Sequence, residues 1–172
     1  MNNVGDRLRP MTADDLETVL AWRNHPQVRR CMFSSGEIAP DEHAAWFARA
    51  SVDTDRMLLI FERDGDPSGF VSFDGTAKGG VVDWGFYLAP EAPRGTGAVL
   101  GRHALDYAFV DNGFHKVCGR VIGFNRRSAA FHLKLGFQQE GILREQHFDG
   151  SCYHDVVCFG MLGVEWLRAE RD

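Results

Sequence analysis

Two segments carry residues whose types and spacing suit the binding of a phosphorylated ligand. The first is the loop Arg94–Ala98 (R-G-T-G-A), which follows the aromatic run Asp83–Leu88 and precedes an apolar stripe of helical period. A strand, a glycine-bearing loop and a helix start present backbone N–H groups and the positive end of a helix dipole to an anion. The spacing is neither that of a Walker loop nor that of the dinucleotide fingerprint. Taken alone, the loop fits an ordinary strand-to-helix turn with an exposed arginine equally well.

The second segment is Asn125–Phe137 (N-R-R-S-A-A-F-H-L-K-L-G-F). Asn125 is suited to cap the start of a helix. Ser128 and His132 are four residues apart and therefore share one helical face. Taken alone, this pattern also fits a capped helix with a histidine that faces solvent.

Composition narrows the class of protein. The chain has 172 residues, a formal net charge of -5, 44% hydrophobic and 25% charged residues, which predicts one globular domain over residues 1–172. The acidic balance argues against a nucleic-acid partner. No apolar run has the length of a membrane span or of a secretory signal, so we expect a cytoplasmic protein without a membrane contact.

The four widely spaced cysteines favour reduced thiols. His147 and His154 flank a terminal hairpin together with Asp149 and Asp155, but no closed ligand set is apparent in the sequence. We therefore predict no metal.

The apolar patterns predict a mixed α+β domain around one central sheet. Helices are expected after Thr12, from Pro40, from Gly97 to Asn112 and from Ser128 to Leu135, with a short polar tail at Leu167–Asp172. Predicted strands are Val4–Arg9, Met57–Glu62, Ser68–Phe73, Val81–Leu88, Val117–Ile122, Ile142–Phe148 and Tyr153–Leu162.

Together, the two segments resemble the GNAT family of N-acetyltransferases, which use acetyl-coenzyme A. In that family a Q/R-x-x-G-x-G/A loop binds the pyrophosphate, and Arg94 and Gly97 fit this pattern. Val99 stands where the family usually has Gly or Ala. The downstream segment matches at Asn125, Ser128, Gly136 and Phe137, whereas His132 replaces the usual tyrosine.

The resemblance implies the GNAT fold, with a twisted, mostly antiparallel sheet of about seven strands flanked by about four helices. It also implies that the strand before the loop carries a bulge and splays from its neighbour, so that the pantetheine arm pairs with it. The residues expected to bind acetyl-coenzyme A are Phe86, Tyr87, Leu88, Arg94, Gly95, Thr96, Gly97, Ala98, Val99, Asn125, Ser128 and His132.

A narrower resemblance lies in W-R-N-H-P-Q-V-R-R-C-M-F (Trp22–Phe33) and E-I-A-P-D-E-H-A-A-W-F (Glu37–Phe47). These segments are similar to the acetyltransferases of pseudaminic acid biosynthesis, which acetylate the 4-amino group of a UDP-linked amino-dideoxy sugar. Arginine matches a diphosphate bidentately, although the aromatic residues fit a helix core and the arginines a solvated face equally well. The predicted substrate-binding residues are Arg23, Asn24, Arg29, Met32, His43, Trp46 and Phe47.

As a mechanism we expect direct attack of the amine on the thioester, without a metal. The Leu88 N–H would polarise the acetyl carbonyl, and Ser72 would position a water that accepts the amine proton. Asp74, Asp83 and His43 are alternatives to Ser72. His132 would protonate the leaving thiolate.

Two other functions remain open. The first is acetylation of a ribosomal-protein N-terminus or another small amine, since the W-R-N-x-P start is shared with such enzymes. The second is a coenzyme-binding sensor without turnover. The terminal hairpin leaves a homodimer open.

Overall fold

The computed structural model describes residues 5–75 and 80–169, which form a seven-stranded sheet in the order β1-β2-β3-β4-β5-β7-β6. All neighbouring strands pair antiparallel except β4 and β5, which are parallel. The strands are β1 (Arg7–Pro10), β2 (Arg56–Arg63), β3 (Asp66–Asp74), β4 (Val81–Leu88), β5 (Lys116–Ile122), β6 (Gln138–Phe148) and β7 (Tyr153–Leu162). The predicted α+β class and the predicted number of strands are confirmed.

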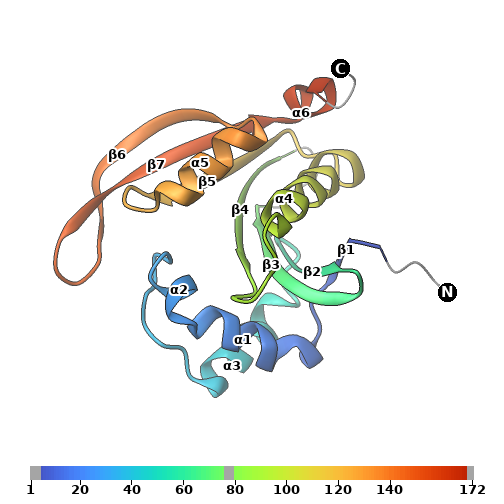
Figure 1. The fold of residues 1–172 in the computed structure, drawn as a ribbon, viewed down its shortest axis with the longest axis vertical. Helices are drawn as coiled ribbons and strands as arrows, with labels where there is room; N and C mark the ends of the chain where they lie inside the picture. Colours follow the sequence, from blue (N-terminus) through green and yellow to red (C-terminus); the bar gives the residue numbers. More distant parts are fainter. Residues whose placement is uncertain (1–4, 76–79, 170–172) are drawn as a thin grey trace.

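Helices lie on both sides of this sheet (Figure 1), and two separate apolar clusters fill the space beneath them. The helices are α1 (Leu16–Asn24), α2 (Pro26–Arg29), α3 (Pro40–Ala50), α4 (Thr96–Asp106), α5 (Arg126–Leu135) and α6 (Gly163–Ala169). The larger cluster joins α4 and α5 to the sheet, and the smaller one lies under α1 and α3. The sheet therefore presents one face to the α4–α5 layer and the opposite face to the α1–α3 layer.

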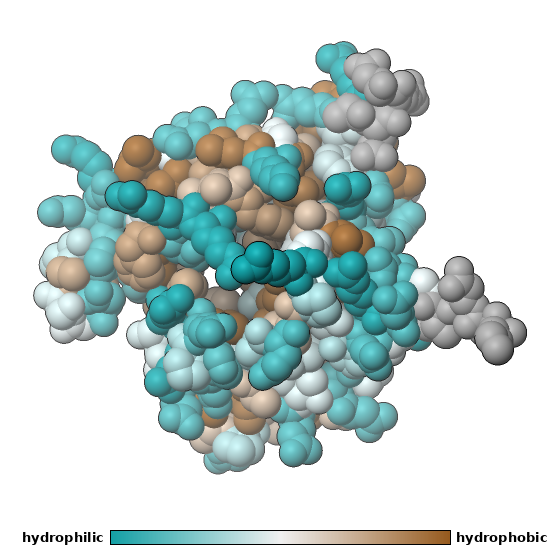
Figure 2. All heavy atoms as spheres, viewed as in Figure 1, coloured by the Kyte–Doolittle hydropathy of each residue, from teal (hydrophilic) through white to brown (hydrophobic). Residues whose placement is uncertain are grey.

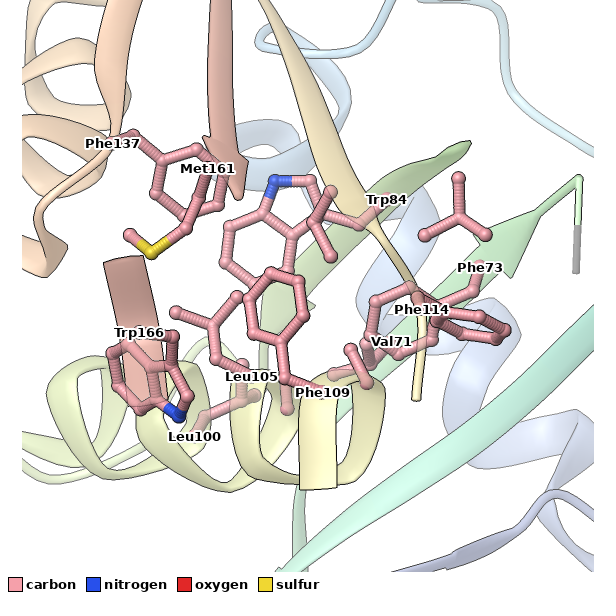
Figure 3. Packing of buried hydrophobic residues seen from close by; sticks show 14 of the residues in the cluster. Val71, Phe73, Trp84, Leu100, Leu105, Phe109, Phe114, Phe137, Met161 and Trp166 are labelled. Atoms are coloured by element: carbon pink, nitrogen blue, oxygen red, sulfur yellow. The ribbon is translucent and has the colours of Figure 1, made fainter. Parts of the chain in front are cut away.

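The side chains of β4 alternate between these two layers, as expected for a strand. Trp84 and Phe86 contribute to the larger cluster, while Tyr87 packs against the smaller one. Figure 3 shows the ring of Trp84 in the larger core, near Phe137 and Leu105. Because β4 is packed from both sides, its backbone is held rigidly in the middle of the molecule.

A charged cluster fixes the first strand to the start of the α1 layer. Arg9 donates to Glu62 over 2.6 Å and makes two hydrogen bonds of 2.8 Å to Asp15. The guanidinium of Arg9 holds the pKa of both carboxyls below their ordinary values. Both carboxylates are buried, and paired buried charges tolerate the loss of either partner poorly.

The structure differs from the predicted elements in the number of helices. The sequence predicts four, and the described residues form six. Helix α2 starts at Pro26, where the sequence predicts no helix, although proline suits the first helical position. Helix α6 occupies part of the predicted polar tail, and Trp166 is buried there with its indole N–H donating to Asp106 over 2.9 Å. This tryptophan is the residue in the sequence that indicates a packed element there.

Some predicted features fall partly outside the described residues. Val4, at the start of the predicted first strand, and residues 76–79 of a predicted turn are among them. No helix in the described part of the chain is long and apolar enough to cross a membrane. The prediction of a single domain stays a prediction.

Candidate active site

The sheet opens between its two parallel strands. β4 pairs with β5 only from Val81 to Asp83, opposite Lys116 to Cys118. From residue 84 onward, β4 has no partner on this side among the described residues, whereas it stays paired with β3 as far as Leu88. The predicted splay is therefore present.

The open edge of β4 carries unused backbone groups. The Ala89 N–H donates to the Ser68 carbonyl over 2.9 Å, and antiparallel pairing alternates residue by residue. The N–H groups of Phe86 and Leu88 consequently point away from β3 and into the gap. The predicted bulge is not found, because the pairing of Asp83–Leu88 with β3 keeps one register throughout.

A cavity of about 590 Å³ occupies this gap and continues to the α2 side of the sheet. Figure 2 shows apolar side chains gathered between α4 and α5, with a hollow beside them that hydrophilic residues border. Its wall on the α4–α5 side includes Leu88, Gly97, Asn125, Ser128 and Phe131. Its wall on the α2 side includes Gln27, Cys31, Met32, Phe33, Asp74, Asp83 and Arg120.

The loop before α4 forms a helix start with unused N–H groups. Gly95 is the N-cap and has φ 90°, a left-handed conformation that favours glycine. Among the described residues, the N–H groups of Gly95 and Gly97 have no acceptor in the protein. Thr96 is fully buried, and its hydroxyl accepts a 2.7 Å hydrogen bond from Arg63 at the end of β2. The hydrogen bond from Arg63 thus holds the loop in place, while the N–H groups of Gly95 and Gly97 remain available to an acceptor.

Helix α5 forms the second wall and is held close to α4. The Asn125 side chain accepts from the Ser128 N–H over 3.2 Å, as the capping pattern predicts. Gly101 of α4 leaves no room for a Cβ, because one placed there would lie 2.8 Å from Leu135 and 2.9 Å from Phe131. This glycine therefore sets the close approach of the two helices beside the gap.

His132 lies at the wall of the cavity, but its ring is almost fully buried. It is 2% exposed, its Nε2 accepts from the Trp84 indole N–H over 3.1 Å, and its Nδ1 lies 2.8 Å from the Ser128 carbonyl. A carbonyl can only accept, so the ring is the neutral tautomer with its proton on Nδ1. Burial lowers the pKa of His132 below its ordinary value, against the opposing effect of the Ser128 carbonyl.

This geometry does not fit the predicted role of general acid. Both ring nitrogens of His132 are engaged, and protonation of Nε2 would oppose two donors, the new N–H and the indole N–H of Trp84. Gly119 of β5 makes room for the arrangement, because a Cβ there would lie 2.5 Å from His132 Nε2 and 2.9 Å from Trp84 Nε1. The histidine ties α5 to β4 at the point where the sheet opens.

A sequence model of the acetyltransferase (GNAT) domain matches residues 7–138, which is more than half of the chain. The chain belongs to the GNAT acetyltransferase family. The predicted fold, the enzyme class and acetyl-coenzyme A as co-substrate are those of this family.

Two curated relatives are similar to this GNAT chain. An uncharacterized N-acetyltransferase of Bacillus subtilis (strain 168), the SPbeta prophage-derived YokL, is 35% identical over 113 residues, which are 63% of either chain. This match thus spans less than two thirds of that relative. Spermidine N(1)-acetyltransferase of Escherichia coli (strain K12) is 23% identical over 167 residues, which are 96% of this chain and 90% of the relative.

Solved structures share the fold. Spermidine N-acetyltransferase from Vibrio cholerae, in complex with CoA and spermine, has a TM-score of 0.88 at 23% identity and covers 96% of this chain and 99% of its own. A dodecameric structure of the same enzyme has a TM-score of 0.81 at 22% identity. At these identities the likeness shows the GNAT fold alone.

The structure brings most of the predicted coenzyme residues to the gap. Cavity-lining residues among them are Phe86, Tyr87, Leu88, Gly97, Asn125, Ser128 and His132. Arg94 and Gly95 are exposed at the loop, whereas the side chain of Thr96 is buried and Val99 packs against the core. Ala98 is half-buried in the first turn of α4. The roles of these residues in binding stay predictions.

Most of the predicted substrate residues lie elsewhere, and only Met32 of that set lines the cavity. His43 is buried and stacks on Trp46, which together with Phe47 packs on the smaller core cluster. Burial, followed by the charge of Arg23, lowers the pKa of His43. The aromatic residues of α3 therefore pack in the core beneath that helix, which was the alternative to a role in substrate binding.

The residues predicted to bind a diphosphate make contacts within the chain instead. The Asn24 side chain donates to the Ile38 carbonyl and accepts from the Ile38 N–H, over 2.8 and 2.9 Å, so it holds the loop before α3. Arg23 donates to the Ser34 carbonyl, and Arg29 lies 3.4 Å from Glu37. These contacts lie within the local fold around α1 and α2, whereas Nη1 of Arg23 is buried and has no hydrogen-bond partner among the described residues.

Asp74, Asp83 and Arg120 line one part of the cavity, called the acceptor end below, which therefore carries both signs of charge. Asp83 lies 3.8 Å from Arg120, with both side chains more than half exposed, and Asp74 is paired with Arg56. Ser72 is half-buried on the same face of the sheet, opposite Gly85 on β4, but does not line the cavity. The predicted role of Ser72 in holding a water stays a prediction.

Sequence reasoning assigned no role to Arg120, Gln27 or Phe33. Arg120 alternates with buried valines along β5, so the period of that strand could have placed it on the acceptor face. Gln27 and Phe33 lie in and after a four-residue helix, whose direction no local pattern predicts.

Proposed function

We propose that this chain transfers the acetyl group of acetyl-coenzyme A to a primary amine of a small cationic molecule. The observation that carries the proposal is the open backbone edge of β4 between the α4 loop and α5. An extended amide chain pairs with such an edge in the way that a strand is added to a sheet. The pantetheine arm of coenzyme A offers amide groups of this kind.

Different residues around the gap would bind different parts of acetyl-coenzyme A. The unused N–H groups of Gly95 and Gly97, with the exposed Arg94, would hold the pyrophosphate at the positive end of α4. The N–H of Leu88, which points into the gap, would donate to the thioester oxygen and stabilise the charge that develops there. Coenzyme A supplies the acetyl thioester and carries away the thiol.

The favoured acceptor is a polyamine or a similar cationic amine. Asp74 and Asp83 line the acceptor end and would attract such a molecule, and both well-covered relatives with a stated substrate act on spermidine. The nucleotide-sugar acceptor is the second candidate. It rests on the sequence similarity of Trp22–Phe33 and Glu37–Phe47. Of the arginines that would hold its diphosphate, Arg23 donates to the Ser34 carbonyl and Arg29 contacts Glu37, while Nη1 of Arg23 has no partner in the described part of the chain.

The amine loses protons during the reaction and the sulfur gains one. The attacking amine must be neutral, and Asp83, which lines the cavity, would accept its first proton directly or through a water. The C–N bond forms as the C–S bond breaks, the nitrogen loses its second proton to solvent as the amide forms, and the thiolate leaves and takes up a proton from solvent. A thiolate is a good leaving group, so this step does not require His132.

The test is an acetyl-transfer assay with release of free thiol as the readout. Spermidine, a UDP-linked 4-amino-dideoxy sugar and a ribosomal-protein N-terminal peptide are compared as acceptors. We expect turnover with spermidine and a fall of at least tenfold in its kcat/KM in Asp83→Asn, since the variant lacks the proton acceptor and also a partner of the bound cation, which alone costs about 1.5–3 kcal/mol. Glu17→Gln, on the exposed surface of α1, is the matched control and should leave kcat/KM unchanged.

Each alternative has its own outcome. Turnover confined to the amino sugar would replace the polyamine assignment, and turnover confined to the peptide would assign a protein substrate. Binding of acetyl-coenzyme A without thiol release on any amine would identify a sensor.

A further inference from the structure

A cluster of three metal-ligand types lies at the tip of the β6–β7 hairpin, outside the proposed active site. It consists of Asp149, Cys152 and His154, whose ligand atoms all lie within 4.8 Å of one another. His154 Nε2 is 2.6 Å from Asp149 Oδ2 and 3.3 Å from Cys152 Sγ, and the sulfur is 3.6 Å from the same carboxylate oxygen. One carboxylate oxygen, one sulfur and one imidazole nitrogen therefore surround a common point.

The arrangement is not that of a catalytic relay. In a nucleophile–histidine–carboxylate relay the two partners engage opposite nitrogens of the ring, so that a proton passes across it. Here both the thiol of Cys152 and the carboxylate of Asp149 approach the same nitrogen, Nε2 of His154. Convergence on one side of the ring suits a shared cation rather than a proton relay.

The ligand atoms are held in place by groups that would not themselves bind the ion. Asp149 Oδ1 accepts from the backbone N–H groups of Ser151 and Cys152 and from the Ser151 hydroxyl, over 2.8–2.9 Å. Oδ2 is thereby turned toward the cluster. The His154 ring is fixed edge-on by Phe124, with 4.8 Å between ring centroids. Supporting contacts of this kind orient metal ligands in proteins.

We propose that Asp149, Cys152 and His154 form a binding site for one divalent transition-metal ion, with Zn²⁺ as the fitting ion. Thiolate, imidazole and carboxylate together are typical ligands of Zn²⁺. In a tetrahedral zinc site such ligand atoms lie about 3.3–3.6 Å apart. The two distances to sulfur already have these values, and only the nitrogen–oxygen pair is shorter, because a proton joins it.

Binding therefore exchanges protons for the metal. The ion displaces the proton between His154 and Asp149, so that this pair separates by less than about 1 Å, and the thiol of Cys152 is deprotonated. The fourth position is left for water. His147 faces His154 across the hairpin, but its ring centroid is 6.4 Å away, too far for it to be a ligand as placed.

The position of the site gives it a structural role next to the acceptor cavity. Figure 1 shows the hairpin tip reaching toward the segment that follows α2. His147 packs edge-on against Phe33, with 5.4 Å between ring centroids, and Phe33 lines the cavity. A metal ion at the tip would hold the hairpin against that wall, while the acetyl transfer itself needs no metal.

The test is a titration of the full chain, freed of metal with a chelator and kept reduced with a phosphine. Co²⁺ serves as the spectroscopic probe, since a bound thiolate gives a charge-transfer absorption, and Zn²⁺ is then added to displace it. We expect one Co²⁺ per chain, displaced by one Zn²⁺. Cys152→Ser should abolish the absorption, and Asp149→Asn and His154→Ala should each weaken Zn²⁺ binding at least tenfold. Ser151→Ala, which removes only a supporting contact, should weaken it by about tenfold.

The matched control is Cys118→Ser, which removes another free cysteine, in β5 and not at the hairpin tip. It should keep the absorption and the affinity. Folding of every variant is checked by melting in the absence of metal, where all should stay close to the parent chain because Asp149 and Cys152 are exposed and His154 is half-buried at the hairpin tip. Binding that is absent, that exceeds one ion per chain, or that survives in Cys152→Ser and His154→Ala overturns the proposal.

Discussion

Replacement of His132 separates a structural role from an acid–base role. In His132→Phe the ring volume is kept, but the indole N–H of Trp84 loses its acceptor in a buried position. Leaving a buried donor unsatisfied costs about 1–3 kcal/mol. In His132→Ala a core cavity is added to this loss, and we expect a total of about 3–5 kcal/mol. For a chain of this size, each kcal/mol lowers the melting temperature by about 2–4 °C.

The pH dependence of stability has a definite sign. Because burial lowers the pKa of His132 in the folded state, the unfolded chain binds the extra proton more readily. The contribution of the neutral ring to stability is complete above about pH 6.5 and is lost as the pH falls below it, by at most about 1.4 kcal/mol per pH unit. His132→Phe should therefore flatten the fall in unfolding free energy between about pH 6.5 and 5. His43, shifted in the same direction, remains in both proteins.

Urea unfolding at several pH values and the pH profile of kcat/KM together decide the role. We expect His132→Phe to lose stability while its pH–rate profile keeps the shape of the parent profile, measured where both are folded. A variant of unchanged stability whose rate falls a hundredfold and loses its dependence at high pH would refute the reasoning. That result would show that His132 donates a proton during turnover.

Three further substitutions test the geometry of the gap. Leu88→Pro removes an N–H that points into the gap and not toward β3, so the fold should persist while kcat falls by about a hundredfold, as measured in the thiol-release assay. Gly119→Ala places a Cβ against His132 and should lower the unfolding free energy by about 1–3 kcal/mol in urea titrations; an unchanged midpoint would contradict the close contact. Arg63→Met removes the hydrogen bond to Thr96 and should raise the KM for acetyl-coenzyme A several-fold with little change in kcat, and equal losses in both would disagree with a positioning role.

The geometry of the α4 loop and of the start of α5 could be predicted from the sequence because its signals are local. The N–H groups of Gly95 and Gly97 and the cap at Asn125 depend on residues within a few positions of each other. Backbone conformation, helix starts and strand ends follow from such short-range chemistry. For the same reason, nearly all of the predicted strands coincide closely with the observed strands.

The acceptor side could not be predicted in this way because distant segments meet there. Asp83 on β4 and Arg120 on β5 come together only through the parallel pairing of two strands. The sequence also offers no sign that the side chain of Asn24 binds the backbone of Ile38. This contact engages a side chain that was predicted to bind the substrate. At the hairpin tip, the spacing D-x-x-C-x-H was visible, but the convergence of its ligand atoms required the β-turn.

The residue at position 132 shows how a family pattern can match in sequence and differ in chemistry. His132 occupies the position of the usual tyrosine, yet its ring is enclosed by Trp84 on β4 and by the bare backbone of Gly119 on β5. Trp84 supplies the donor, His132 the acceptor and Gly119 the space. The three residues lie on three different elements, β4, α5 and β5, and meet beside the gap. Leaving-group protonation must then come from solvent or from another group at the gap, and the favourable departure of a thiolate makes that sufficient.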